Sequence, residues 1–216
     1  MTCKYSENCC GGWEEVGENT VRECQCRREN NAENMVQMEI PLAYQKCSLE
    51  NFRPVRAKER GKAVDLPGAL NCLDSFVLSG PPGSGKTHLL CALATMDARA
   101  GKRIRVFDEE AYYRFVNMSL FGDERELVPP DWLKKDFLTR IDTLYIDDLG
   151  KAKLTEAKRS NLFELLDGLT KMGKRFVFTT NLKGLGRWDT SGDPDFSRSL
   201  QRRMRTARVI SFSGKG

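Results

Sequence analysis

Histidine is almost missing from this chain: one, His88, stands among 216 residues. A metal site built from several imidazoles is therefore excluded. No apolar run approaches the roughly 20 residues that a membrane-spanning helix needs, so we expect no membrane partner. The first ten residues, MTCKYSENCC, have neither the basic start nor the apolar stretch of a secretory leader, and we expect a cytoplasmic protein.

The charge is unevenly spread along the chain. The net charge is +5, but residues 1–50 carry five Lys/Arg against nine Asp/Glu, whereas residues 151–216 carry fifteen against six. A basic C-terminal third suits nucleic acid or nucleotide phosphates, and it equally suits a solvated face. Charge alone leaves both interpretations open.

Cysteine is concentrated at the N-terminus. Five of the eight cysteines lie in the first 26 residues: Cys3, Cys9, Cys10, Cys24 and Cys26. In a reducing cytosol such clustering points to a metal rather than to disulfides. We expect residues 1–30, called the head, to bind one zinc ion through Cys3, Cys24, Cys26 and one of Cys9 or Cys10. An iron–sulfur cluster, which uses the same number of thiolates, is the alternative.

Two segments with different sequence patterns follow the head. Residues 31–70 read as a short helix (31–39) followed by a linker. From residue 71 to 216 short apolar runs alternate with helical patterns: strands at 75–79, 102–107, 142–150, 175–181 and 207–212, and helices at 86–100, 109–121 and 156–172. This alternation predicts an α/β domain with a doubly wound parallel sheet.

The stretch GPPGSGKTHLL, residues 80–90, follows a predicted strand and opens a predicted helix. That context is the one a P-loop requires, because glycines let backbone N–H groups surround phosphate oxygens and the helix N-terminus attracts the same anion. The lysine side chain reaches the terminal phosphates and the threonine hydroxyl ligates Mg²⁺. We predict that ATP contacts Gly80, Pro81, Pro82, Gly83, Ser84, Gly85, Lys86, Thr87 and His88.

Polar residues end the next two strands of interest. Asp147 and Asp148 close the strand in LYIDDLG, and Asn181 closes the strand in FVFTTN. We predict that Asp147 holds Mg²⁺ together with Thr87, that Asp148 orients or deprotonates the attacking water, and that Asn181 lies beside the γ-phosphate. The simpler alternatives are solvent-facing acids and a turn-forming asparagine.

Two further segments have more than one interpretation. FSRSLQRRMRTAR (196–208) holds five arginines and no acid, so Arg198 is a candidate arginine finger for a neighbouring subunit, unless the segment is solvated or binds nucleic acid. YYRF (112–115) combines aromatic rings with an arginine, which suits stacking on bases, unless the rings belong to the core.

Taken in order, GPPGSGKTHLL, LYIDDLG, LFELLD, FVFTTN and SRSLQRRM resemble the bacterial and phage helicase-loader ATPases of the DnaC/DnaI type, over about residues 41–212. Transposition helper ATPases of the IstB type share this AAA+ module. The resemblance implies Asp147 and Asp148 as the Walker B acids, Asn181 as sensor 1 and Arg198 as the finger. The head resembles a zinc-binding module that docks on the replicative helicase, although its first cysteines, Cys3 and Cys9, do not form a Cys-x-x-Cys pair.

The resemblance implies a Mg²⁺-dependent ATPase that loads a replicative ring helicase onto single-stranded DNA and forms a homo-oligomer when ATP and DNA bind. A transposition helper acting on duplex DNA is the second hypothesis. A small-molecule P-loop kinase does not explain the two acids or the head. A zinc-containing adaptor that binds ATP without turnover is distinguished only by an activity measurement.

Overall fold

The structure is a computed structural model that describes residues 3–17, 20–53, 57–59, 62–63, 65–70, 74–121, 136–151, 155–182, 198 and 202–213. Its strands are β1 (Cys9–Cys10), β2 (Trp13–Gly17), β3 (Thr20–Glu23), β4 (Ala57–Glu59), β5 (Lys62–Ala63), β6 (Phe76–Ser79), β7 (Ile104–Asp108), β8 (Thr143–Asp147), β9 (Arg175–Thr180) and β10 (Arg208–Phe212). Its helices are α1 (Gln25–Glu39), α2 (Leu66–Leu70), α3 (Lys86–Arg99), α4 (Glu109–Phe121) and α6 (Glu156–Lys171), with 3₁₀ turns η1 (Leu42–Tyr44) and η3 (Met204–Thr206).

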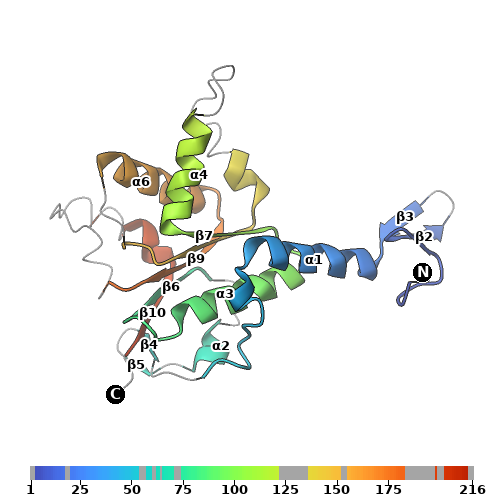
Figure 1. The fold of residues 1–216 in the computed structure, drawn as a ribbon, viewed down its shortest axis with the longest axis horizontal. Helices are drawn as coiled ribbons and strands as arrows, with labels where there is room; N and C mark the ends of the chain where they lie inside the picture. Colours follow the sequence, from blue (N-terminus) through green and yellow to red (C-terminus); the bar gives the residue numbers. More distant parts are fainter. Residues whose placement is uncertain are drawn as a thin grey trace.

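A seven-stranded sheet forms the centre of the body, in the order β5-β4-β10-β6-β9-β8-β7 (Figure 1). The five strands from β10 to β7 are parallel to one another. These are the five strands that the sequence predicts, and the α/β prediction is confirmed. Because the strands are parallel, their carboxyl ends meet at one edge of the sheet, where the loop 80–85, Asp147, Asp148 and Asn181 lie.

Each face of the sheet is buried under helices. Figure 1 shows α1 and α3 on one side and α4 and α6 on the other. Successive strand residues point to opposite faces, so Tyr145 packs in the core beneath α3 while its neighbours Leu144 and Ile146 pack in the core beneath α4 and α6. All three are fully buried. This double coverage explains why the strands read as continuous apolar runs.

The sequence-based description of residues 31–70 needs two corrections. The first helix, α1, begins at Gln25 rather than at residue 31, because Cys24 serves as its N-cap and the Cys-rich stretch continues directly into the helix. In addition, β4 and β5 extend the sheet within the predicted linker, β4 pairing antiparallel with β10. These strands are too short and too polar for their sequence to reveal them.

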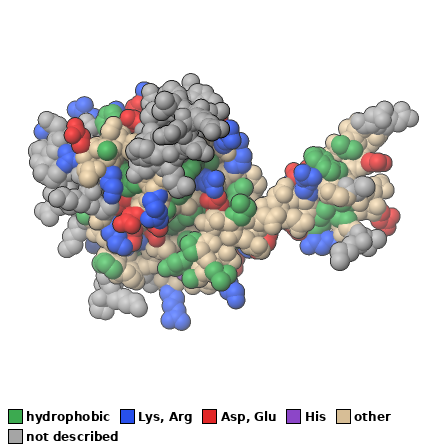
Figure 2. Space-filling model, turned by 45° about the horizontal axis from the view of Figure 1, so that its top comes forward, with side chains coloured by type: hydrophobic (Ala, Val, Ile, Leu, Met, Phe, Trp, Pro, Cys, Tyr) green, Lys and Arg blue, Asp and Glu red, His purple; other side chains and the backbone are tan. Residues whose placement is uncertain are grey.

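Helix α1 is the stem that joins the head to the body. Its buried Val36 packs in the core beside α3. At its C-terminal end the Glu39 carboxylate accepts a hydrogen bond of 3.0 Å from the backbone N–H of Val106 and pairs with Arg105. Glu39 thus covers part of the exposed edge of β7. The N-terminal part of α1 carries the head away from the body (Figures 1 and 2).

Candidate functional site

The phosphate-binding loop, Gly80–Gly85, connects the buried strand β6 to α3 at the carboxyl edge of the sheet. Gly80 has to be a glycine because a Cβ there would lie 2.8 Å from Cβ of Phe212 and 2.9 Å from its carbonyl oxygen. Gly85, the N-cap of α3, has a φ of 85°, a conformation that glycine adopts without strain. The loop is therefore packed closely against β10 while its backbone opens at the helix N-terminus.

Lys86 is the first residue of α3, and its side chain reaches back into this loop. Its side chain is 5% exposed, and its ammonium group donates a hydrogen bond of 2.9 Å to the carbonyl oxygen of Pro81. Burial lowers the pKa of Lys86, since the charged form loses water. The ammonium is thus held where the loop would surround an anion, as the sequence predicts for a group that binds phosphate oxygens.

Thr87 and Asp147 are brought together from α3 and β8. The Thr87 hydroxyl donates to Oδ2 of Asp147 at 2.9 Å, and Oδ1 lies 3.1 Å away. Hydroxyl and carboxylate oxygens are ligands that Mg²⁺ prefers. The two residues that the sequence assigns to Mg²⁺ therefore fit such an ion.

Asp148 points in a different direction from Asp147. It is the one non-glycine residue with a positive φ, 55°, among those the structure describes. Its Oδ1 accepts a hydrogen bond of 3.2 Å from the amide of Asn181, which extends from the end of β9. The second acid and the asparagine therefore form a pair, and each directly follows the end of its strand, β8 or β9.

One residue of this constellation is not evident from the sequence. The hydroxyl of Thr179, on β9, donates to Oδ1 of Asp147 at 2.5 Å and accepts from the backbone N–H of Asp148 at 2.9 Å. In a sequence, a threonine inside a predicted strand is explained by the preference of threonine for β-strands and gives no sign of a role in the site. Only the pairing of β8 with β9 shows that it contacts both acids.

His88 faces the segment that precedes the domain. Its Nε2 lies 3.0 Å from the carbonyl oxygen of Ser48, and its ring packs against Phe52 at 5.4 Å between centroids. A residue two positions after Lys86 is rotated by about 200° around the helix, so it points away from the lysine. A contact between His88 and the nucleotide stays a prediction.

Arg198 is exposed and helical. An exposed side chain is what a finger that acts on a neighbouring molecule needs, and the role stays a prediction. Residues 183–197 and 199–201 around it lie outside the described part of the chain.

The base-stacking interpretation of YYRF is wrong for its two tyrosines. Tyr112 and Tyr113 are 2% and 3% exposed and belong to the core beneath α4 and α6. Tyr112 packs edge-on against Phe107, which also contacts Phe115. Of the four residues of YYRF, only Arg114 is exposed.

The head brings four thiols together. The sulfur atoms of Cys3, Cys9, Cys24 and Cys26 all lie within 4.8 Å of one another. Sγ of Cys3 is 3.6 Å from Sγ of Cys24, and Sγ of Cys9 is 3.6 Å from Sγ of Cys26. Four thiolates at about 2.3 Å around one zinc ion are separated by about 3.8 Å, so the cluster fits tetrahedral zinc.

The structure also bears on the choice between Cys9 and Cys10. Cys9 is in the cluster, whereas the side chain of Cys10 lies outside the described residues.

The thiols of the cluster differ in their pKa values. The pKa of the Cys3 thiol is lowered to about 6, chiefly by a hydrogen bond from the backbone N–H of Tyr5, while burial raises the pKa of Cys26 to about 12. A bound cation would favour the thiolate form of all four.

Apolar side chains are exposed on the β2–β3 hairpin of the head. Trp13, Val16 and Val21 are 42%, 46% and 57% exposed. The guanidinium of Arg27 lies 4.5 Å from the Trp13 ring centroid. Figure 2 shows the head as a separate lobe that carries apolar side chains together with acidic and basic ones.

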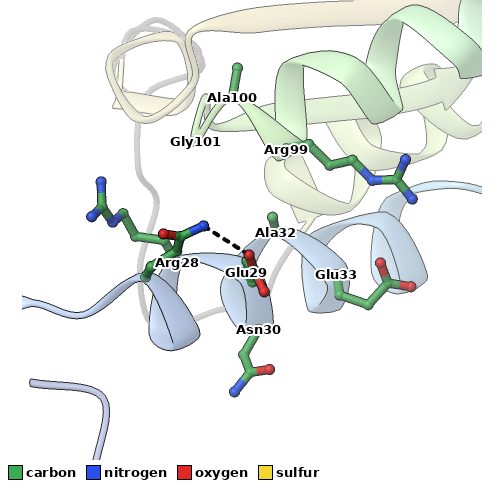
Figure 3. Close-up of a pocket in the computed structure, with 9 residues that line it drawn as sticks. Arg28, Glu29, Asn30, Ala32, Glu33, Arg99, Ala100 and Gly101 are labelled. Carbon is green, nitrogen blue, oxygen red and sulfur yellow. Dashed lines mark hydrogen bonds between the residues drawn. The ribbon is translucent and has the colours of Figure 1, made fainter. Parts of the chain in front are cut away.

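A groove of about 850 Å³ lies where α1 crosses the C-terminal end of α3 (Figure 3). Arg28 and Arg99 face it together with Glu29 and Glu33. Because α3 begins at Lys86 and ends at Arg99, this groove is at the opposite end of the helix from the phosphate-binding loop. It is therefore separate from the nucleotide site.

A search of the helices in the described ranges found none with the length and hydropathy of a membrane span.

The family model described as "IstB-like ATP binding protein" matches residues 18–215. The insertion sequence ATP-binding protein y4pL of Sinorhizobium fredii is 27% identical over 170 residues, which cover 76% of this chain and 66% of the relative. The replicative helicase loader DnaC of Escherichia coli is 25% identical over 168 residues, covering 68% of this chain and 62% of the relative. The chain thus spans slightly less than two thirds of each relative.

Solved structures confirm the fold. The crystal structure of the DnaC helicase loader matches with a TM-score of 0.57 at 18% identity, over 80% of this chain and 99% of that one. The structure of DnaI matches with a TM-score of 0.51 at 18% identity, over 93% and 87% of the two chains. AMPPCP-bound DnaA from Aquifex aeolicus matches with a TM-score of 0.56 at 21% identity, over 77% and 50%. The AAA+ P-loop fold predicted from the sequence is therefore correct.

Proposed function

We propose that this chain, which belongs to the family of IstB-like ATP binding proteins, hydrolyses ATP to load a replicative ring helicase onto single-stranded DNA. Its general role is that of an AAA+ ATPase, and both helicase loaders and insertion-sequence ATPases are among its relatives. The loader role is the finer part of the proposal. The observation that carries it is the four-thiol head, which projects from the ATPase body on α1.

In the proposed hydrolysis of ATP, each site residue has a different role. Lys86 and the backbone N–H groups of the loop bind the phosphates, and Thr87 and Asp147 hold Mg²⁺, which neutralises phosphate charge. Asp148 accepts a proton from the attacking water, and the Asn181 amide fixes its carboxylate. Arg198 of a neighbouring subunit completes the site in a homo-oligomer.

The head holds zinc through Cys3, Cys9, Cys24 and Cys26 and presents Trp13 to the helicase. Its β-strands are short and mostly exposed, so they bury too little apolar surface to fold alone. The metal would supply much of the folding free energy of the head. In this proposal the head docks on the helicase while the basic C-terminal third contacts single-stranded DNA in the cytoplasm.

A transposition helper is the second candidate, and the family match together with the similarity to y4pL favours it. In that case the partner is a transposase and the DNA is duplex. The kind of DNA bound and the partner protein therefore distinguish a transposition helper from a helicase loader.

The deciding experiment uses the full chain with ATP and Mg²⁺. The purified protein is mixed with the replicative helicase of its own source, and co-elution, ATPase rate and DNA binding are measured. A loader co-elutes with the helicase and prefers single strands, with an affinity that falls as salt is added because counterions are released. Preference for duplex DNA without helicase binding would support the transposition role, and no turnover under any condition would leave an ATP-binding adaptor.

A further inference from the structure

Thr179 connects the two acids of the nucleotide site. It lies on β9, next to β8, and it is fully buried. Its hydroxyl is 2.5 Å from Oδ1 of Asp147 and 2.9 Å from the backbone nitrogen of Asp148. Both acids therefore depend on one side chain that comes from a neighbouring strand.

The direction of these hydrogen bonds follows from the atoms available. A backbone N–H can only donate, so the Thr179 oxygen accepts from Asp148. The single hydroxyl hydrogen is then left for the carboxylate of Asp147. Thr87 donates to the other oxygen of the same carboxylate at 2.9 Å. The Asp147 carboxylate is thus fixed between two hydroxyl groups.

The same contact bears on the backbone of Asp148. A φ of 55° is unusual for a residue with a side chain, and it persists only where the surroundings hold it. The hydrogen bond from the Asp148 N–H to Thr179, together with the bond from the Leu149 N–H to the Thr179 carbonyl at 2.8 Å, holds the chain in this turn. The turn directs the Asp148 side chain to Asn181 rather than along the strand.

We propose that Thr179 is a positioning residue of the ATPase: its hydroxyl orients Asp147 for Mg²⁺ and holds Asp148 toward the attacking water. This inference rests on the proposed hydrolysis of ATP. The neighbouring Thr180 does not share the role, since its hydroxyl accepts from the N–H of Leu182 at 3.2 Å and contacts neither acid.

The test replaces the hydroxyl with a methyl group of similar size. Thr179→Val should lower kcat and raise the Mg²⁺ concentration needed for half-maximal nucleotide binding, each by about 10- to 100-fold, the range found when a partner of a metal ligand is removed. At saturating Mg²⁺, KM for ATP should change little because Lys86 and the loop are untouched. Thr179→Ser, which keeps the hydroxyl, should have a kcat and a Mg²⁺ requirement close to those of the wild type.

A matched control separates positioning from stability. Thr143→Val, at the other end of β8, removes a buried hydroxyl that donates to Asp97 at 3.0 Å. It should lower the unfolding midpoint in urea without altering the Mg²⁺ dependence.

Two results would overturn the inference: a Thr179→Val protein with the wild-type kcat and Mg²⁺ midpoint, or an equal loss of activity in Thr179→Val and Thr143→Val. Were the wild-type chain to lack turnover, the proposed function would fail, and the Mg²⁺ midpoint for nucleotide binding would still test Thr179.

Discussion

The hydroxyl of Thr87 lies 2.9 Å from the carboxylate of Asp147, so the first turn of α3 and the carboxyl end of β8 are joined at the nucleotide site. The two residues are 60 positions apart in the sequence. Their contact means that a change at the phosphate-binding loop or at either acid should affect nucleotide chemistry without disturbing the core, which lies on the two faces of the sheet.

Lys86→Ala should abolish ATP binding and turnover while the chain remains folded. In the proposed site the ammonium group is the charge that would reach the terminal phosphates, and alanine offers no substitute. Binding of a fluorescent ATP analogue and the urea unfolding curve check this. Lys171→Ala, at an exposed helix position, is the control and should bind normally. Wild-type hydrolysis in Lys86→Ala would remove the phosphate-binding assignment.

Asp148→Asn should bind ATP normally and lower kcat by about 100-fold or more, because the amide keeps the shape but lacks the basic oxygen. Asp147→Asn should instead raise the Mg²⁺ requirement, since this acid is paired with Thr87. Steady-state kinetics at several Mg²⁺ concentrations distinguishes the two variants. A loss of hydrolysis in Asp147→Asn at saturating Mg²⁺, with full activity in Asp148→Asn, would reverse the assigned roles.

Tyr112→Ala should destabilise the fold by about 3–5 kcal/mol, the range for removing a buried aromatic ring. The ring is 2% exposed in the core beneath α4 and α6. Urea unfolding measures the effect, and Arg114→Ala, on the exposed face of the same helix, should be nearly neutral. A variant with unchanged stability and lost DNA binding would restore the stacking interpretation.

The parallel strands and the P-loop could be predicted because their signals are local: apolar runs, a helix start and a glycine loop. Contacts between strands left no such signal, and Thr179 meets Asp147 only through the pairing of β9 with β8. The hairpin of β4 and β5 was missed because strands of three and two residues carry too little pattern. The burial of Tyr112 depended on how α4 is rotated against the sheet, which a mixed aromatic and basic stretch does not reveal.

Arg198→Ala should act on the neighbouring subunit. A finger completes the site next to it, so a mixture of Arg198→Ala and Lys86→Ala proteins should regain part of the ATPase activity that each lacks alone. The exposure of Arg198 is consistent with such a role. Activity is measured in mixtures shown to co-assemble by light scattering. Co-assembly without any rescue would indicate that the arginine is solvated or contacts DNA.

Cys24→Ser should release the metal from the head and abolish partner docking while leaving basal ATP hydrolysis intact. Cys24 is buried, its sulfur lies 3.6 Å from that of Cys3, and as N-cap of α1 it joins the cluster to the stem. A hydroxyl is a poor replacement for a thiolate in a four-thiolate site.

Elemental analysis of protein purified without chelators measures the metal content of the wild type and the variant. About one zinc per wild-type chain and none in Cys24→Ser supports the head as a zinc module. Cys47→Ser changes a cysteine outside the cluster and should keep its zinc. Iron with visible absorbance would identify an iron–sulfur cluster instead, and a wild-type chain with neither metal would show that the four thiols do not form a metal site.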